Sequence, residues 1–166
     1  LFMNHGVAFL DLFVEHLHKL VADKQEASQR CAAEIISGLV KGTKHWSYDN
    51  MQKLQQELTP ILKVVLNNMT CETFNDWGTC FAAMFEGIDV SRLGWILKIV
   101  EDSVIEECSS ALLCGRLFML QAAILQHPWR FASYSNKLLK RFKDAGMLHH
   151  PYQNVRDRMA KYYFLF

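Results

Sequence analysis

Proline and glycine are scarce in this sequence: of its 166 residues, three are proline and eight are glycine. No Asn-Gly or Asp-Gly pair, the usual signal of a tight hairpin turn, occurs along the chain. Residues that favour helix, such as Leu, Ala, Met, Glu and Lys, are plentiful instead. The composition therefore favours an all-α fold over a strand-and-turn fold.

Long hydrophobic runs are also missing. No apolar stretch reaches the roughly 18 residues that a membrane span needs. The first residues, LFMNHGVAFL, lack the basic segment of a signal peptide. We therefore expect a protein of the nucleus or cytoplasm with no membrane partner.

The cysteines show neither the even number nor the C-x-x-C spacing of a disulfide framework or a zinc site. Each falls inside an apolar helical pattern, which is typical of small buried side chains in a reducing compartment. The five are Cys31, Cys71, Cys80, Cys108 and Cys114.

Catalytic motifs are absent too: the sequence contains no G-x-S-x-G, G-x-x-x-x-G-K-[ST], G-x-G-x-x-G or H-E-x-x-H. His16 and His18 lie two residues apart and so face different sides of a helix, which makes them a poor metal pair. The carboxylate pairs Glu101–Asp102 and Glu106–Glu107 are sequential and are interpreted as solvated charge. We predict no catalytic residues, no metal site, no bound cofactor and no enzyme activity.

Charge is distributed unevenly along the chain. Residues 1–128 have 10 Lys and Arg against 15 Asp and Glu, a net charge of −5, whereas residues 129–166 have 8 against 2, a net charge of +6. Lys137, Lys140 and Arg141 share one helix face by their spacing. They are the candidate contacts for an anionic ligand or an acidic protein surface, and the alternative is an ordinary solvent-facing helix.

Helical periodicity covers nearly the whole sequence. Ser47 and Asp89 supply N-cap signals, and Gly42, Gly87 and Gly146 supply stops. The pattern predicts helices near 3–22, 26–41, 48–68, 72–86, 90–103, 107–126, 129–144 and 152–166. Because proline lacks a backbone N–H, we expect Pro60 to kink the third of these helices or to split it after Leu58.

A long-range period argues for stacked helix pairs. Arg30 in QRCAAEIISGL and Arg156 in NVRDRMAKYYF are three intervals of 42 residues apart, and Glu72 and Cys114 occupy the intermediate positions near helix starts. Intervals of this length are typical of HEAT and armadillo units. We predict a HEAT/ARM-like α-solenoid of about four stacked helix pairs, with approximate repeats at 1–42, 47–87, 89–126 and 128–166.

The residues at the repeat positions suit such a stack. A small residue, Ala33 or Ala160, follows each arginine and lets its helix approach a neighbour. Arg30 or Arg156 can then bond exposed carbonyls or an acidic group of the adjoining repeat.

Aromatic residues fit the same interpretation. Tryptophans in repeat proteins usually fill the layers between helices, so we expect core packing rather than a ligand cage for Trp46, Trp77, Trp95 and Trp129. The final segment carries an apolar stripe of Val155, Met159, Tyr162, Tyr163 and Phe166 with no stop signal. We expect this stripe to pack on a further repeat, as in a segment cut from a longer superhelix.

Specific strings carry a resemblance to a known family. RCAAEIISGLVKGTKHW (30–46), TFNDWGTCFA (73–82) and YQNVRDRMAKYY (152–163), with PWR at 128–130, resemble an internal segment of the proteasome activator subunit 4 family, the large ATP-independent HEAT-repeat activators. The match follows their order and separation over most of residues 25–163.

The resemblance implies a function without chemistry of its own. The family forms a hollow dome that caps the 20S proteasome core particle, opens its gate without ATP, and promotes degradation of peptides and acetylated histones in DNA repair and spermatogenesis. Its tyrosine-containing gate-opening tail is expected to be absent here, because the sequence stops at Phe164-Leu165-Phe166. Its acetyl-lysine module has no counterpart in this sequence, so histones are expected as partners of the full-length protein only.

The family dome also binds inositol phosphates in basic openings, and the resemblance leaves Lys137, Lys140 and Arg141 as the candidates for such contacts here. No direct nucleic-acid partner is expected. The alternative function is a HEAT-repeat adaptor or transport scaffold that binds protein partners on its concave face.

Overall fold

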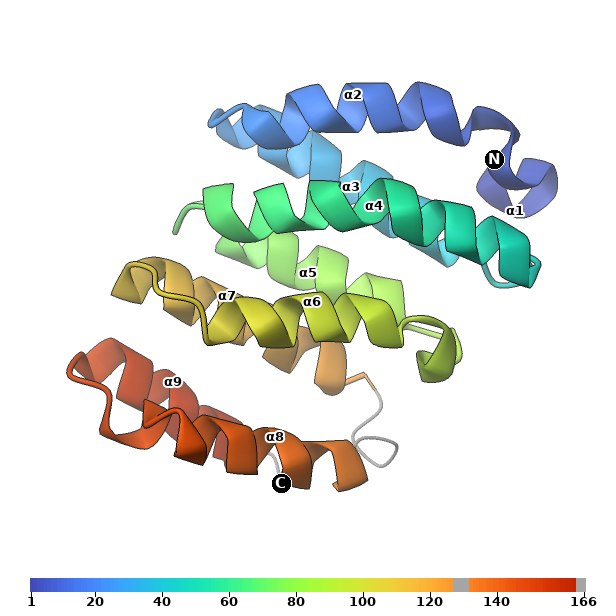
Figure 1. Cartoon of the computed structure of the whole chain (residues 1–166). Helices are drawn as coiled ribbons and strands as arrows, with labels where there is room; N and C mark the ends of the chain where they lie inside the picture. Colours follow the sequence, from blue (N-terminus) through green and yellow to red (C-terminus); the bar gives the residue numbers. More distant parts are fainter. Residues whose placement is uncertain (127–131, 164–166) are drawn as a thin grey trace.

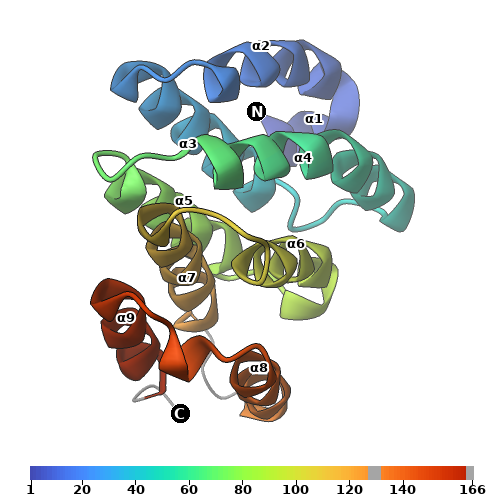
Figure 2. The same ribbon diagram turned by 60° about the vertical axis from the view of Figure 1, so that its left-hand side comes forward.

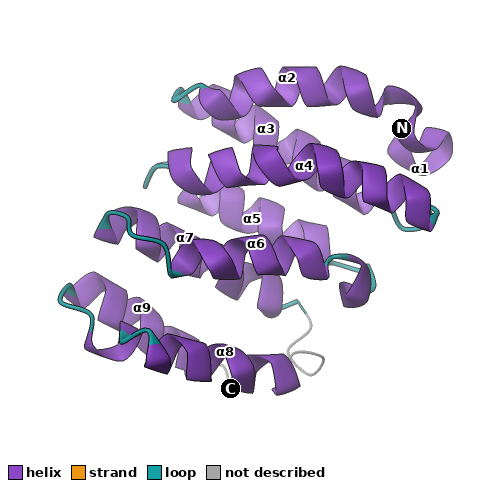
Figure 3. Ribbon diagram, viewed as in Figure 1, coloured by secondary structure: helices purple, strands orange, loops and turns teal. Residues whose placement is uncertain are grey.

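The computed structural model describes the backbone of residues 1–126 and 132–163, and the side chains of 1–126 and 134–161. These residues form helices and turns and contain no strand (Figures 1 and 3). The α-helices are α1 (Phe2–His5), α2 (Leu10–Ala22), α3 (Glu26–Lys41), α4 (Tyr48–Asn68), α5 (Phe74–Phe85), α6 (Gly94–Val104), α7 (Ser110–Ile124), α8 (Ala132–Asp144) and α9 (Gln153–Tyr163). Short 3-10 helices are η1 (Gly6–Phe9), η2 (Val90–Arg92) and η4 (Met147–His149).

The helices stack in two layers. In one layer α2, α4 and α6 lie side by side with α8 below them, and in the other α3, α5, α7 and α9 follow one another (Figures 1 and 2). The chain alternates between the layers, so each pair of helices packs mainly on the pair before it and the pair after it. This arrangement confirms the predicted all-α solenoid of stacked helix pairs. The predicted repeat boundaries stay a prediction.

Helix α4 shows how the sequence dictates an element. Its N-cap Ser47 accepts a hydrogen bond from the Asn50 backbone N–H, as the cap signal predicts. Of the two predicted effects of Pro60, the split after Leu58 does not occur, because α4 continues to Asn68, and the kink stays a prediction. Both Gln56, whose carbonyl loses its partner, and Pro60 are exposed, so water can reach the free carbonyl. An apolar stripe that spans the proline holds both halves in the core: Met51, Leu54, Leu58, Ile61, Leu62, Val65 and Leu66 are all buried.

The first predicted helix, 3–22, is wrong at its start. Gly6 has a φ of 57°, a conformation that favours glycine, and the chain breaks there into α1, η1 and α2. The break lets Phe2 fold back onto the core. The centroids of the Phe2 and Phe13 rings are 5.1 Å apart, and Trp46 Nε1 donates a hydrogen bond to the Phe2 carbonyl at 3.0 Å. Trp46 is therefore a core residue, as predicted.

Helices α5 and α7 approach each other at two glycines. A Cβ on Gly78 of α5 would lie 2.8 Å from the ring of Phe118, and a Cβ on Gly115 of α7 would lie 2.5 Å from the ring of Phe74. Each helix thus places a phenylalanine ring over a glycine of the other. This reciprocal packing brings the second and third helix pairs closer than any residue with a side chain would allow.

Candidate functional site

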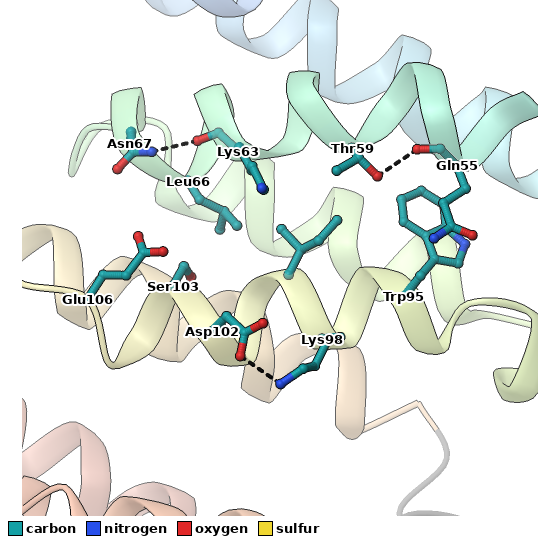
Figure 4. Close-up of a pocket in the computed structure, with 11 residues that line it drawn as sticks. Gln55, Thr59, Lys63, Leu66, Asn67, Trp95, Lys98, Asp102, Ser103 and Glu106 are labelled. Carbon is teal, nitrogen blue, oxygen red and sulfur yellow. Dashed lines mark hydrogen bonds and ion pairs between the residues drawn. The ribbon is translucent and has the colours of Figure 1, made fainter.

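A groove runs between α4 and α6 on one face of the stack. It consists of two adjoining cavities of about 510 and 400 Å³ that share Gln55 and Trp95 in their linings. The first cavity is bordered by aromatic and amide side chains, including Trp46, Tyr48 and Gln52. The second extends toward Asp102 and Glu106 near the end of α6 (Figure 4). Trp95 is half-buried at the junction, whereas Tyr48 is 77% exposed.

Polar contacts tie successive helix pairs together along one side of the stack, at the C-terminal ends of α2 and α4. We call this set of residues the polar seam: Gln29, Asn67, Asn68, Trp77 and Arg116. Gln29 is fully buried, donates to the carbonyls of Val21 and Asp23, and accepts from Trp77 Nε1 at 3.0 Å. Asn68 also donates to the Val21 carbonyl, at 3.2 Å. The C-terminal ends of α2 and α4 are thereby joined to α3 and α5.

Arg116 completes the polar seam in the third pair. Its guanidinium donates to the Leu66 carbonyl at 3.0 Å, to the Ser103 carbonyl at 2.5 Å and to Asn67 Oδ1 at 2.5 Å. Its side chain is 1% exposed, and the nearest carboxylate oxygen, of Glu106, is 4.0 Å away. The planar guanidinium bonds carbonyls at the ends of α4 and α6 at once, which a lysine cannot do, and the Ser103 carbonyl also accepts from the Glu106 N–H at 3.3 Å.

The polar seam was not predicted from the sequence, although the sequence contains a signal for a buried arginine. Arg116 is the one charged residue among the fifteen of α7, in a helix that is otherwise uncharged. A single arginine in such a helix is buried only when its hydrogen bonds are satisfied. Gln29 directly precedes Arg30, the residue that marks the 42-residue period in the sequence.

The residues predicted as repeat positions have different surroundings. Arg30 Nε donates to Asp76 of α5 at 3.0 Å, which is a contact with an acidic group of the next pair, and Ala33 is buried. Arg156 donates to the carbonyls of His150 and Pro151 in the turn before its own helix. Ala160 is exposed among the described residues. The equivalence of the two sets stays a prediction.

The three basic candidates of α8 do not act together. Arg141 donates to both Glu101 and Asp102 of α6. Its charge is therefore used to join α8 to α6, and it is not free to bind an anion. Lys137 and Lys140 are exposed, and anion or inositol phosphate binding stays a prediction for these two.

The interpretation of Glu101 and Asp102 as solvated charge is wrong in consequence. Glu101 has a side chain only 13% exposed and also accepts a hydrogen bond from the Tyr134 hydroxyl. Partial burial by itself raises the pKa of Asp102, but hydrogen bonds from Lys98 and Arg141 outweigh it and leave the pKa below its ordinary value. The pair is an ionic link between α6 and α8, which belong to successive helix pairs.

The remaining predictions concern chemistry. Among the described residues, no group of three or more His, Cys, Asp or Glu side chains is placed to hold a metal ion. Within the same residues, no helix is long and apolar enough to cross a membrane.

The cysteines differ in their surroundings. Cys80 is buried, and this burial raises the pKa of its thiol. Cys31 and Cys71 were expected to be buried, but both are exposed. Trp129, the string at 128–130 and the side chains of Tyr162, Tyr163 and Phe166 lie outside the described residues.

Helix pairs stacked in two layers and joined by arginines and close glycine contacts define an α-solenoid of the HEAT-repeat class. A family model described as "Proteasome activator complex subunit 4-like, HEAT repeat-like" matches residues 1–122. The chain belongs to this family.

Three relatives illustrate the relationship. The chain is 41% identical over 161 residues to proteasome activator complex subunit 4 of Bos taurus, 42% to subunit 4A of Danio rerio and 40% to subunit 4 of Homo sapiens. Each match covers 96% of this chain and 9% of the relative. The chain therefore spans about a tenth of the length of the curated relatives it matches.

Proposed function

We propose that this chain is an architectural segment of a large ATP-independent activator that caps the 20S proteasome core particle and opens its gate. The observation that carries the proposal is the identity of about 40% to proteasome activator subunits over 96% of the chain. The segment supplies the wall of the activator, because its buried polar groups are used between helix pairs.

The contacts of the arginines support a structural role over a chemical one. The guanidiniums of Arg30, Arg116 and Arg141 each bond groups on another helix pair. In a wall made in this way, each pair is held to the next by directional bonds as well as by apolar burial. The chain is a regulator in this proposal and not an enzyme.

The finer parts of the proposal are supported only by the resemblance to this family. The full-length protein promotes degradation of peptides and of acetylated histones, acts in DNA repair and spermatogenesis, and is located in the nucleus and cytoplasm. Histones are bound by a module outside this segment. A second candidate function is a HEAT-repeat adaptor or transport scaffold, which the groove between α4 and α6 favours as a place for a protein partner.

The test uses the full-length protein that contains this segment. Purified 20S core particle is assayed without ATP for hydrolysis of a fluorogenic peptide, alone, with the full-length protein, and with the 166-residue chain. We expect stimulation by the full-length protein and none by the chain alone. A full-length protein that neither stimulates hydrolysis nor retains the core particle in a pull-down, but retains transport or scaffold partners, would establish the adaptor instead.

A further inference from the structure

Three of the five cysteines gather where α5 and α7 begin. Cys71 lies in the turn of residues 71–73 that leads into α5. Cys108 directly precedes the N-cap of α7, and Cys114 lies in the second turn of that helix. The Cys114 thiol interacts electrostatically with the thiols of both Cys71 and Cys108. The cluster therefore joins two successive helix pairs, because α5 belongs to the second pair and α7 to the third.

Close packing of α5 on α7 brings Cys71 toward Cys114. The ring of Phe74 lies over Gly115, where an added Cβ would be only 2.5 Å away. Cys71 precedes that phenylalanine by three residues, and Cys114 directly precedes that glycine. The second glycine contact between these helices lies one turn further along both, so α5 and α7 run parallel and their starts are neighbours. A disulfide demands a specific placement of its two sulfurs, and Cys71, in a turn rather than a helix, can adjust toward Cys114.

The two thiols differ in how readily they meet a reagent. Cys71 is exposed, whereas Cys114 is half-buried. Burial raises the pKa of the Cys114 thiol, and the nearby guanidinium of Arg158 offsets part of this effect. Arg158 lies 5.0 Å from the ring centroid of Phe118, one turn after Cys114 on α7. An exposed thiol reacts first with a dissolved oxidant, and a more protected neighbour then resolves the product.

We propose that Cys71 and Cys114 form an oxidation site, at which a peroxide converts the two thiols into a disulfide between the second and third helix pairs. Among the described residues no three His, Cys, Asp or Glu side chains are placed to hold a metal ion, so thiol chemistry suits the cluster better than metal binding. In a reducing compartment such a bond is transient and returns to two thiols. The inference concerns this chain alone and does not depend on binding to the core particle.

The oxidation proceeds in two steps that balance. The Cys71 thiolate attacks one oxygen of hydrogen peroxide, the O–O bond breaks, and the leaving hydroxide takes a proton to become water, which leaves Cys71 as a sulfenic acid. The Cys114 thiolate then attacks the Cys71 sulfur, so that an S–S bond forms, the S–O bond breaks and a second water leaves. The two thiols together lose two electrons and two protons, and the peroxide gains them.

The experiment treats the fully reduced 166-residue chain with hydrogen peroxide. Remaining thiols are blocked with an alkylating reagent, and the chain is digested and analysed by mass spectrometry without reducing agent, with fragment spectra to assign the linked residues. We expect peptides joined through Cys71 and Cys114, and a fall from five free thiols to three because two are joined. Dithiothreitol should restore all five.

Variants identify the two sulfurs. Cys71→Ser and Cys114→Ser should each abolish the disulfide, and the exposed position of Cys71 keeps the test valid if Cys114→Ser impairs folding, which circular dichroism checks. Cys31→Ser removes another exposed thiol, on α3, and is the matched control that should leave the disulfide yield unchanged. A bond from Cys114 to Cys108, a dimer linked through Cys71, or a Cys71 sulfinic acid beside a free Cys114 would each overturn the proposal.

Discussion

At the scale of single residues, Arg116 joins three partners on two other helices through one buried side chain. Its three hydrogen bonds reach α4 and α6 from α7, and two of them end on backbone carbonyls that no mutation can remove. The Leu66 carbonyl, near the end of α4, receives its hydrogen bond from Arg116. Loss of the guanidinium leaves the buried Leu66 carbonyl without this donor, whereas the Ser103 carbonyl keeps the hydrogen bond from the Glu106 N–H and Asn67 is exposed.

Arg116→Met is therefore expected to lower the free energy of unfolding by about 2 kcal/mol, even though methionine fills much of the space. Arg116→Lys is expected to destabilise as well, because an ammonium group cannot reach three acceptors in a plane. Urea unfolding followed by circular dichroism measures both. The matched control is Lys140→Met, an exposed cation whose loss should change stability by less than about 0.5 kcal/mol. An Arg116→Met chain as stable as the wild type would show that the polar seam is dispensable.

Residue-scale prediction from the sequence succeeded where a pattern was local and failed where partners are distant. The Ser47 cap needs only the backbone three residues on, so its sequence signal is sufficient. Arg116 bonds groups 13 to 50 residues away, and nothing in the local pattern indicates them. Arg141 was recognised as a cation, but Glu101 lies 40 residues from it in sequence, so the pairing was not predicted.

At the scale of elements, the reciprocal glycine contacts set the distance between α5 and α7. Gly115→Ala places a methyl group against the Phe74 ring, and Gly78→Ala places one against Phe118. Helix propensity favours alanine by about 1 kcal/mol, whereas overpacking costs about 1–3 kcal/mol, so the second effect wins.

We expect each substitution to lower the unfolding free energy by up to about 2 kcal/mol in thermal or chemical denaturation. Gly38→Ala is the matched control within α3, because no atom lies within 4 Å of its Cβ position. It is expected to raise stability by about 0.5–1 kcal/mol. Stabilisation by Gly115→Ala of the same size as by Gly38→Ala would contradict close packing of α5 on α7.

The link between α6 and α8 is expected to depend on pH. The pKa of Asp102 is lower in the folded chain than its ordinary value of 3.8, so its stabilising effect is present above about pH 4 and disappears as pH falls through the lower folded value. Since the carboxylate is partly exposed, the contribution is about 0.5 kcal/mol. Asp102→Asn should therefore be less stable than the wild type at pH 7 and equal to it near pH 2.

Hydrogen exchange in α8 measures that link directly, and it should be faster in Asp102→Asn at pH 7. Asp144→Asn, at the end of α8 where the side chain is exposed, is the control and should not change the exchange of this helix. A stability difference between Asp102→Asn and the wild type that persists undiminished at pH 2 would mean that Asp102 does not act through its charge.

Element-scale prediction was accurate for helix positions and less so for breaks. Predicted 26–41 and 48–68 coincide with α3 and α4, because their apolar stripes and end signals agree. The break at Gly6 escaped prediction because it depends on Phe2 packing against Phe13 and the distant Trp46. Pro60 does not end α4, since tertiary burial of both halves outweighs one missing backbone bond.

At the scale of the whole molecule, the chain is a stack in which each helix pair contacts its neighbours. The stability of such a molecule is the sum of the pairs and of the interfaces between successive pairs. Damage at one interface should therefore remain near it. A globular bundle with a shared core would instead lose protection everywhere at once.

The measurement that tests this architecture most directly is residue-resolved hydrogen exchange of the wild-type chain and of Arg116→Met under the same native conditions. The account predicts that protection falls most in α4, α6 and α7, which Arg116 connects, and least in α2 and α3 at the start of the stack. An equal loss of protection in all of these helices would contradict a stack held together by contacts between neighbouring pairs.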